Sequence, residues 1–468
     1  MEFFYNFPVL NYTMIKYIRL ALFSLFLPVL AAAQSTLPAN MFLQKLSNGL
    51  DVLVIEDNSV PLATVMLTCK NGSYTESPQY NGLSHLYEHM FFKANKDYDS
   101  QEEFLSRISE LGMRYNGGTQ YENVNYYFTL PKTNLKEGLK FMNSAIRYPK
   151  FDPAEMKKEN EVVDDEFQRQ ESNPLYALND AMSHHMWGDL YSRKNIIGDH
   201  NVIRNATPAL MDSIKNKYYF PNNMLLTVAG DVQHDDVFSQ VEKIYGSWKP
   251  SGFDPFKKWP IPEFTPLQKK DCFVVESKLA QVPEIKVEWM GPDTRTDVPA
   301  TYTADVFSFI LDQTASKLNK ALVQSGLALQ IDFGYITLNH VGPIELSVIP
   351  NPDKINECMT EIKRQIDQWD AGDYFTDEQL KLALRKMEIR QVREQEVTSD
   401  YVQALSFWWA STSLDYFMGY NDNMQKVTRA DLQNYVRKYL KGRPYCAGLL
   451  INPDKETKTD TQQFTNAN

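Results

Sequence analysis

The sequence predicts an α+β protein of two similar domains, each a sandwich with helices on one face of a mixed, mostly antiparallel sheet. Three observations support this prediction. Strand-like and helix-like segments alternate along the 468 residues. A proline-rich stretch divides the chain near its middle. A segment beginning at Thr207 recurs from Thr428, 221 residues later, which indicates a duplicated unit.

The first half begins with a predicted hairpin. Apolar stretches within 42–55 flank Asn48-Gly49, a favoured two-residue turn. A strongly β-prone strand follows at 61–69, and the Gly-, Asn- and Tyr-rich segment 115–130 predicts a pair of strands. Apolar residues at helical spacing predict helices at 81–94, 101–112, 133–147 and 153–170.

Prolines mark the boundary between the halves. Five fall between Pro250 and Pro266, a density that excludes a helix interior or a central strand. On either side, Thr207 and Thr428 each occupy the N-cap position of an amphipathic helix, and an apolar strand follows at 224–229 and at 446–451. We therefore expect an N-terminal domain at 34–248, a linker at 249–268, a C-terminal domain at 269–455 and a flexible tail at 456–468.

Composition excludes several classes of protein. Hydrophobic residues make up 43% and charged residues 23%, as in ordinary globular proteins. The net charge is −11, from 48 Lys and Arg against 59 Asp and Glu, which is the wrong sign for a nucleic-acid binder. The cysteines are more than eighty residues apart, so we expect buried thiols, with a long-range disulfide as the alternative. They are Cys69, Cys272, Cys358 and Cys446.

The N-terminus has the pattern of an export signal. A short basic region from Met14 to Arg19 precedes an apolar stretch, which ends in Ala31-Ala32-Ala33. We expect residues 1–33 to be a signal peptide, with Met1 or Met14 as the start, and the mature chain to be periplasmic or secreted. The apolar stretch is shorter than the roughly 20 residues of a membrane span, so an anchor is the weaker alternative. We expect no membrane span after cleavage.

The strongest chemical motif is His85-Leu-Tyr-Glu88-His89. Histidines at i and i+4 share a helical face and can reach one metal ion, while Glu88 lies beside that face and can accept a proton from water. This H-x-x-E-H order is that of the inverzincin peptidases. The alternative is a solvated helix face, but the flanking Leu, Met and Phe residues favour a buried helix, in which charge needs a partner.

An acidic segment offers a third ligand. Glu159 and Glu166 share a predicted helical face with Val162 and Val163, which suggests that the face turns inward. The other acids of the segment, Glu161, Asp164 and Asp165, are expected on the solvated surface.

These residues resemble the pitrilysin and mitochondrial-processing-peptidase family of zinc peptidases. The similarity runs from about Leu43 to about Asn452 and is most specific at 82–93, with Glu166 placed 77 residues after His89. The resemblance implies that His85, His89 and Glu166 bind one Zn²⁺ per chain, with Glu88 as general base and Glu159 as an auxiliary carboxylate. It also implies a clam-like arrangement of the domains.

By the same resemblance, Asn116, Gly117, Gly118 and Thr119 belong to an edge strand along which an extended peptide lies. The implied activity is hydrolysis of peptides or unfolded segments. Zinc, rather than manganese or cobalt, follows from the ligand types and the resemblance. A loop or bulge is the alternative for Gly117-Gly118.

The sequence departs from the family in its second half. An Arg and a Tyr seven residues apart often hold substrate there, but the matching positions are Leu322 and Leu329, which cannot donate hydrogen bonds. Either Tyr335 or another residue substitutes, or a homologous partner chain supplies the pair. We favour a heterodimer with a metal-free sister subunit, with a homodimer as another possibility. The competing function is a non-catalytic peptide-binding subunit.

The remaining histidines are expected to be structural or solvated. They are His184, His185, His200, His234 and His340.

Overall fold

The computed structural model describes residues 37–455 and 460–465, and the chain from Leu37 onward forms one compact unit. The expected signal peptide lies outside the described residues. Within them, no helix combines the length and apolar character needed to cross a bilayer.

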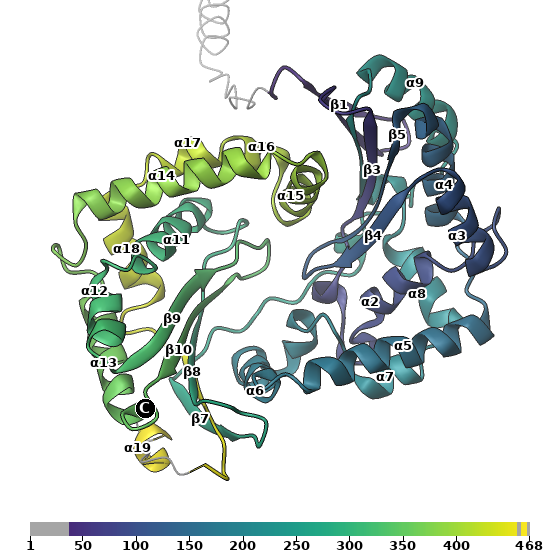
Figure 1. The fold of residues 1–468 in the computed structure, drawn as a ribbon. Helices are drawn as coiled ribbons and strands as arrows, with labels where there is room; N and C mark the ends of the chain where they lie inside the picture. The colour runs from purple at the N-terminus through teal and green to yellow at the C-terminus, as the bar shows by residue number, and fades with distance from the viewer. Residues whose placement is uncertain (1–36, 456–459, 466–468) are drawn as a thin grey trace, which may run out of the picture. The chain divides into compact units, whose positions relative to one another are not determined.

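The first half builds a six-stranded sheet of order β1-β2-β6-β3-β5-β4 (Figure 1). Only the β2–β6 pair is parallel. The strands are β1 (Met41–Lys45), β2 (Asp51–Glu56), β3 (Leu62–Cys69), β4 (Arg114–Thr119), β5 (Val124–Pro131) and β6 (Met224–Gly230). The helices are α2 (Leu83–Phe91), α3 (Gln101–Glu110), α4 (Leu135–Arg147), α5 (Pro153–Glu171), α6 (Tyr176–Trp187), α7 (His200–Arg204), α8 (Pro208–Tyr218) and α9 (His234–Tyr245).

The second half builds a five-stranded sheet of order β7-β11-β8-β10-β9, in which only β7 and β11 are parallel. Its strands are β7 (Asp271–Glu276), β8 (Glu284–Met290), β9 (Ala328–Tyr335), β10 (Pro343–Pro350) and β11 (Cys446–Ile451). Its helices are α11 (Val298–Leu311), α12 (Lys317–Asn319), α13 (Ile355–Gln368), α14 (Asp377–Glu394), α15 (Thr398–Ser411), α16 (Leu414–Met418), α17 (Tyr420–Met424), α18 (Arg429–Tyr439) and α19 (Thr461–Thr465). The short α10 (Pro255–Lys258) lies in the expected linker.

The two sheets have the same topology. Strands β2-β6-β3-β5-β4 correspond in order and direction to β7-β11-β8-β10-β9. Among the helices, α2, α4, α5, α6 and α8 take the chain positions of α11, α13, α14, α15 and α18. The α+β class with mixed, mostly antiparallel sheets is confirmed, and the shared topology agrees with the duplication inferred from the sequence.

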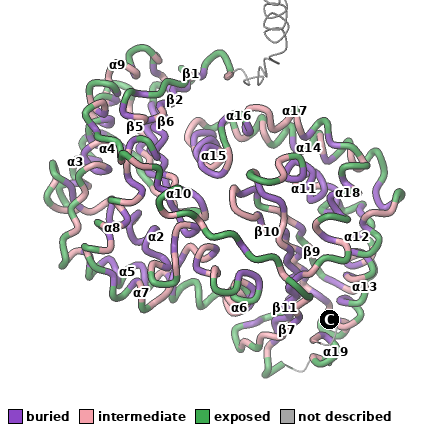
Figure 2. The backbone as a smooth tube through the Cα atoms, turned by 180° about the vertical axis from the view of Figure 1, so that it is seen from behind, coloured by how far each residue is buried: buried purple, intermediate pink, exposed green. Residues whose placement is uncertain are grey.

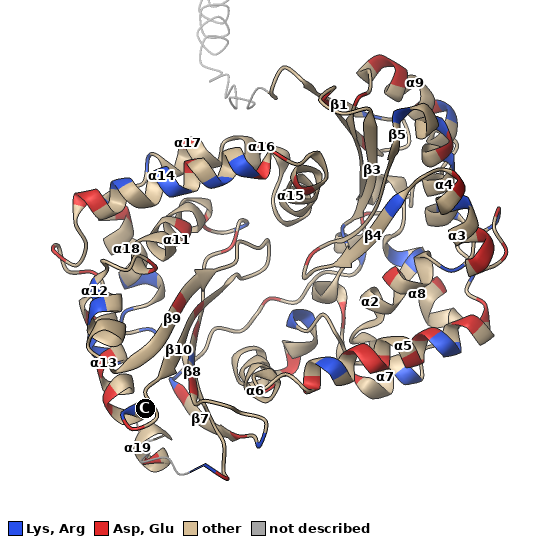
Figure 3. Ribbon diagram, in the orientation of Figure 1, with Lys and Arg blue, Asp and Glu red and all other residues tan. Residues whose placement is uncertain are grey.

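Each sheet is covered in part by a helix from the other half. Helix α15 packs its apolar residues, including Leu405 and Trp409, against Leu53 and Met66 of the first sheet. In return, α6 packs Leu178 against the second sheet near Leu450. The central strands of the two sheets are buried, while α5 and α14 carry mixed charges (Figures 2 and 3). Neither sheet therefore buries its apolar surface with residues of its own half alone.

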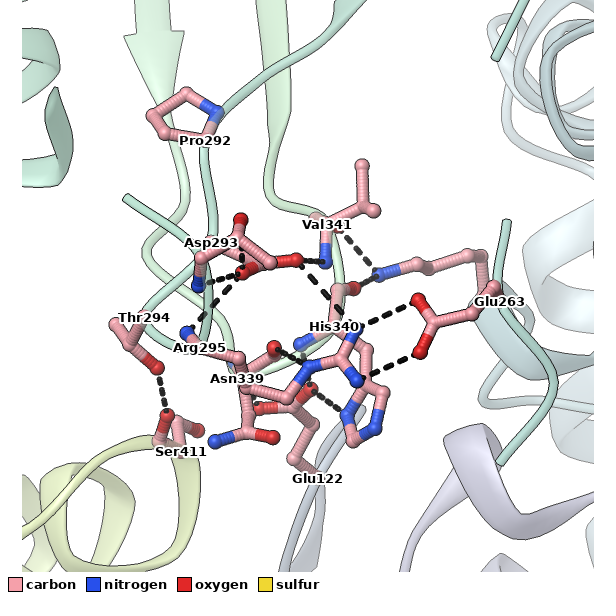
Figure 4. Close-up of polar contacts among 12 residues, drawn as sticks. Glu122, Glu263, Pro292, Asp293, Thr294, Arg295, Asn339, His340, Val341 and Ser411 are labelled. Carbon is pink, nitrogen blue, oxygen red and sulfur yellow. Dashed lines mark hydrogen bonds and ion pairs between the residues drawn. The ribbon is translucent and has the colours of Figure 1, made fainter. Parts of the chain in front are cut away.

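A polar contact joins the halves at the β9–β10 connection (Figure 4). Glu122, which is 1% exposed, follows β4 and accepts hydrogen bonds from the backbone N–H groups of Asn339 and His340 at 2.7 and 2.8 Å. Lys194 donates to the carbonyls of His340 and Val341. Val341, whose carbonyl takes part in this contact, has a φ of 46°, which a β-branched residue rarely adopts.

Three local expectations need correction. The β1–β2 loop has three residues rather than two, because the Leu46 N–H pairs with the Leu50 carbonyl and Gly49 takes a φ of 88°. At the repeated helix starts, Thr428 makes a capping box but the Thr207 side chain makes no capping bond. The tail, expected to be flexible, includes α19, because its one large apolar residue, Phe464, is buried in the second core.

The cysteine expectation is borne out. All four cysteines are buried and free, with no disulfide among them.

Candidate metal centre

Helix α2 carries the His-x-x-Glu-His motif and is fixed at its N-terminus by a buried carboxylate. Glu76 accepts hydrogen bonds from the N–H groups of Gly82 and Ser84 at 2.7 and 2.6 Å. These two N–H groups are among those that have no partner within the helix at its N-terminus. A negative carboxylate there is also stabilised by the positive end of the helix dipole. Burial raises the pKa of Glu76 to about 8. Leu86 and Met90 bury the opposite face of α2 in the first core.

Three predicted ligands converge. The Nε2 atoms of His85 and His89 lie 3.2 Å apart, and Glu166 Oε2 lies 3.7 Å from His85 Nε2 and 3.5 Å from His89 Nε2. Donor atoms about 2.0–2.2 Å from a tetrahedral zinc stand about 3.3–3.6 Å apart, so these separations fit one ion. It is the one group of metal-binding side chains found in the described part of the chain. Helices α2 and α5 therefore bring together residues 77 positions apart.

The two imidazoles lie in different electrostatic surroundings. Burial and the neighbouring His89 lower the pKa of His85 to about 3, so its ring is neutral. His89 Nδ1 lies 2.8 Å from Glu159 Oε1, and a proton shared there leaves Nε2 with a free lone pair directed at the site. Burial alone would lower the pKa of His89, but the bond to Glu159 and the nearby carboxylates outweigh it and raise that pKa.

Glu159 is itself held by a residue that the sequence analysis did not single out. Lys93 forms an ion pair with the second oxygen of Glu159. The bonds from His89 and Lys93 outweigh burial and hold the pKa of Glu159 below its ordinary value. Lys93 lies four residues after His89, just past the end of α2, and that i+4 spacing is the signal that could have identified it.

Glu88 lies beside the three ligands, 9% exposed. Its Oε2 accepts a hydrogen bond from the Thr119 hydroxyl at 3.0 Å, and burial raises its pKa. Strand β4 passes so close that a Cβ on Gly117 would lie 2.7 Å from Glu88 Oε1. Thr119 and Gly117, expected as substrate residues, thus also contact the expected base.

The site opens into a cavity of about 1130 Å³. Along one wall run Asn116, Gly117, Gly118 and Thr119 of β4, which is the edge strand of its sheet. Gly117 and Gly118 therefore lie in a regular strand rather than a loop or bulge. The facing wall comes from the second half and includes Lys286, Glu288 and Glu345.

The acidic helix departs from its expected pattern at two positions. Val162, expected to face inward, is 43% exposed. Asp164, expected on the surface, is buried and forms ion pairs with His200 at 2.5 Å and Arg204 at 2.7 Å, the first and last residues of α7. Periodicity within α5 could not predict partners contributed by another helix.

Leu322, Leu329 and Tyr335 do not supply the expected hydrogen-bond donors. Leu322 is buried in the second core and Leu329 is 60% exposed. The Tyr335 hydroxyl donates to the Pro292 carbonyl at 2.9 Å, and Tyr335 is not among the residues that line the metal cavity.

Each of the other five histidines lies beside an acidic side chain away from the metal-binding group. His184 lies near Asp180, His185 pairs with Asp271, His234 with Glu56 and His340 with Glu122. His200 pairs with Asp164, as described above. Within the described chain none of these five belongs to the metal-binding group.

Comparison with known proteins gives two family matches. Residues 51–199 match "Insulinase (Peptidase family M16)" and residues 205–387 match "Peptidase M16 inactive domain". An uncharacterized zinc protease of Rickettsia felis is 29% identical over 210 residues, which cover 45% of this chain and 51% of that protein. A probable mitochondrial-processing peptidase subunit beta of Arabidopsis thaliana is 26% identical over 219 residues, covering 47% and 41%.

The fold also matches solved structures. A protease from Helicobacter pylori superimposes with a TM-score of 0.77 at 21% identity, covering 88% of this chain and 99% of the other. In sequence, the chain spans about half the length of the curated relatives that it matches first. The two family matches together extend across most of the described chain, and the chain belongs to the pitrilysin family of peptidases, the M16 family.

Proposed function

We propose that this chain is a zinc metalloendopeptidase that hydrolyses peptides or unfolded protein segments. The observation that carries the proposal is the convergence of His85 Nε2, His89 Nε2 and Glu166 Oε2 at zinc-like separations beside a buried carboxylate. Two imidazoles and one carboxylate are the ligand set of a catalytic zinc site, which keeps a position open for water. We assign one zinc to each chain.

A bound zinc ion would polarise a peptide carbonyl and make a water molecule more acidic. Glu88 accepts the proton of that water and returns it to the leaving amine, and its raised pKa suits both steps. Glu159 acts through His89, since its bond to Nδ1 orients the ring.

Strand β4 positions the substrate in this proposal. In the described part of the chain it pairs only with β5, so its outer backbone groups can bind an extended peptide as an added strand. Such binding depends on backbone groups and makes little demand on the substrate's side chains. We assign Asn116, Gly117, Gly118 and Thr119 to this role.

The test combines metal analysis with peptide hydrolysis. Glu88→Gln should retain about one zinc per chain while hydrolysis of an unstructured peptide falls by about 10²- to 10⁴-fold, because a general base is lost. Glu161→Gln, an exposed acid on α5, is the matched control and should leave both measurements unchanged. Unchanged hydrolysis in Glu88→Gln would eliminate Glu88 as the base.

We further propose that a homologous partner chain completes the site. The positions expected to hold an Arg and a Tyr are Leu322 and Leu329, and Tyr335 does not line the metal cavity. The likeness to a mitochondrial-processing peptidase subunit supports a heterodimer with a metal-free sister. If the zinc-loaded chain alone cleaved peptides at a normal rate, the partner requirement would fail. A non-catalytic peptide-binding subunit remains the second candidate function, and the two leucines favour it.

We also propose that the protein works outside the cytoplasm, on the strength of the signal-like sequence at 14–33.

A further inference from the structure

The two histidines of the metal centre are held in different ways. His89 Nδ1 lies 2.8 Å from Glu159 Oε1, so a second side chain orients that ring. His85 Nδ1 is buried, and none of the described residues forms a hydrogen bond to it. A histidine that binds a metal normally has such a partner, which fixes the direction of its ring. The direction of His85 Nε2 therefore depends on the backbone of His85, and so on the start of helix α2.

The start of α2 is capped from outside the helix. The N-cap residue, Gly82, has a φ of 93° and no side chain that could accept a hydrogen bond. Glu76 supplies the acceptors instead, since its Oε2 accepts from the Gly82 N–H at 2.7 Å and its Oε1 from the Ser84 N–H at 2.6 Å. Ser84 immediately precedes His85. One carboxylate thus fixes the backbone within one residue of the first expected ligand.

Glu76 and the turn that it caps are themselves held firmly. Glu76 is 3% exposed, and the Ser192 hydroxyl donates to its backbone carbonyl at 3.0 Å. The Gly82 backbone packs closely against Gly198, because a Cβ atom on Gly82 would lie 2.7 Å from the Gly198 Cα. The first turn of α2 therefore has little freedom to move while the Glu76 carboxylate is in place.

We propose that Glu76 is the positioning residue of the first metal ligand, holding the start of α2 where His85 Nε2 faces His89 Nε2 and the Glu166 carboxylate. The assignment rests on the proposed function, since it requires zinc at these three ligands. Glu76 does not line the metal cavity, so it acts through the backbone of α2 alone. Glu159 differs, because it acts on the ring of His89 directly.

Zinc affinity of the purified full chain, measured by competition with a chelator, tests the proposal. Glu76→Gln keeps the size of the side chain but sets an NH₂ donor against one of the two N–H donors. We expect zinc to bind about tenfold more weakly or worse. Normal zinc affinity in the folded variant would overturn the proposal. Absence of zinc binding by the unmodified chain would instead overturn the proposed function, so the two failures are distinguishable.

Glu122→Gln is the matched control. Glu122 is 1% exposed and also accepts two backbone N–H bonds, at 2.7 and 2.8 Å, but from Asn339 and His340 of the second half. The variant should bind zinc normally. An equal loss of zinc affinity in Glu76→Gln and Glu122→Gln would contradict a specific role of Glu76, because any lost buried hydrogen bond would then have the same effect.

A double-mutant cycle separates positioning of His85 from general support of the fold. In a His85→Ala background, Glu76→Gln should weaken zinc binding by less than about twofold, because the ligand that it positions is gone. In a Glu159→Gln background, which affects His89 instead, the full loss of about tenfold should remain. A tenfold loss in both backgrounds would contradict the proposal.

Glu76→Asp keeps the test decisive if Glu76→Gln does not fold. Its carboxylate is one methylene group shorter and cannot reach both N–H groups at their present positions. We expect a native circular dichroism spectrum with weakened zinc binding. Normal zinc affinity in Glu76→Asp would show that the start of α2 does not depend on this carboxylate.

Discussion

At the scale of single residues, Gly117 determines where Glu88 can lie. A methyl group there would meet Glu88 Oε1 at 2.7 Å and its Cγ at 3.0 Å, closer than Cβ atoms are found. We predict that Gly117→Ala lowers hydrolysis by about 10²-fold, because a catalytic group displaced by about 1 Å loses its alignment. Zinc content should stay the same, since the ligands are not displaced.

Gly334→Ala, on strand β9 of the second sheet, is the matched control for this prediction. Its Cβ would meet no atom within 4 Å. Equal activity in the two variants, measured on one peptide, would show that the contact between β4 and Glu88 is unimportant.

A second residue-scale prediction concerns Glu159. Its bond to His89 Nδ1 holds the ring that directs Nε2 at the site, and Lys93 holds Glu159 in turn. We predict that Glu159→Gln weakens zinc binding by about 10- to 100-fold in a competition assay with a chelator. Glu155→Gln, one turn earlier on α5, removes a half-buried acid that pairs with Lys158 and should bind zinc normally. An unchanged zinc affinity in Glu159→Gln would show that Glu159 does not support the metal site.

At the scale of elements, two helices join the halves, because α6 of the first half packs on the second sheet and α15 of the second half packs on the first sheet. Leu405 of α15 is fully buried against the first sheet although it belongs to the second half of the chain. We predict that Leu405→Ala lowers the free energy of unfolding by about 2–5 kcal/mol, from lost burial and the cavity left behind. Urea unfolding measures this, with the half-buried Gln403→Ala as control. A loss of unfolding free energy below about 1 kcal/mol, on the order of a surface substitution, would contradict the packing of α15 on the first sheet.

Elements show where sequence reasoning succeeds. The six helices and strands expected between 61 and 147 are present within a few residues, because each has a strong period or a clear start and end signal. The closeness of His85 and His89 was predictable for the same reason, since the pair needs only one helical turn, whereas Glu166 was added to them by the family resemblance. Asp164, Val162 and Glu76 were not, because their surroundings come from segments that meet only in the folded chain.

At the scale of the whole molecule, Glu122 ties the first half to the β9–β10 connection. Its two oxygens accept from Asn339 and His340, so Glu122→Gln would set an NH₂ donor against one of these N–H donors. We predict that amide hydrogen exchange at Asn339 and His340 then becomes about tenfold faster or more. The nearby Glu263→Gln, whose ion pair with Arg295 is exposed, should leave these rates unchanged. Unaltered exchange in Glu122→Gln would exclude this role.

The duplication gives the molecule two hollows of different chemistry. The first lies between α2, α5 and β4 and holds the metal-ligand set. The second, of about 320 Å³, lies between α11, α14 and β9 and is lined by Asp305, Glu394, Arg390 and aromatic rings. The sequence repeat around Thr207 and Thr428 predicted the duplication, but not that the second hollow persists. Its lining comes from residues too far apart in the chain to be grouped by spacing.

The most direct test of the metal centre is anomalous X-ray diffraction from crystals of the zinc-loaded protein, recorded at the zinc absorption edge. We predict a single strong peak about 2.0–2.2 Å from His85 Nε2, His89 Nε2 and a carboxylate oxygen of Glu166. A zinc peak without Glu166 among its neighbours, or no peak between α2 and α5, would contradict the account.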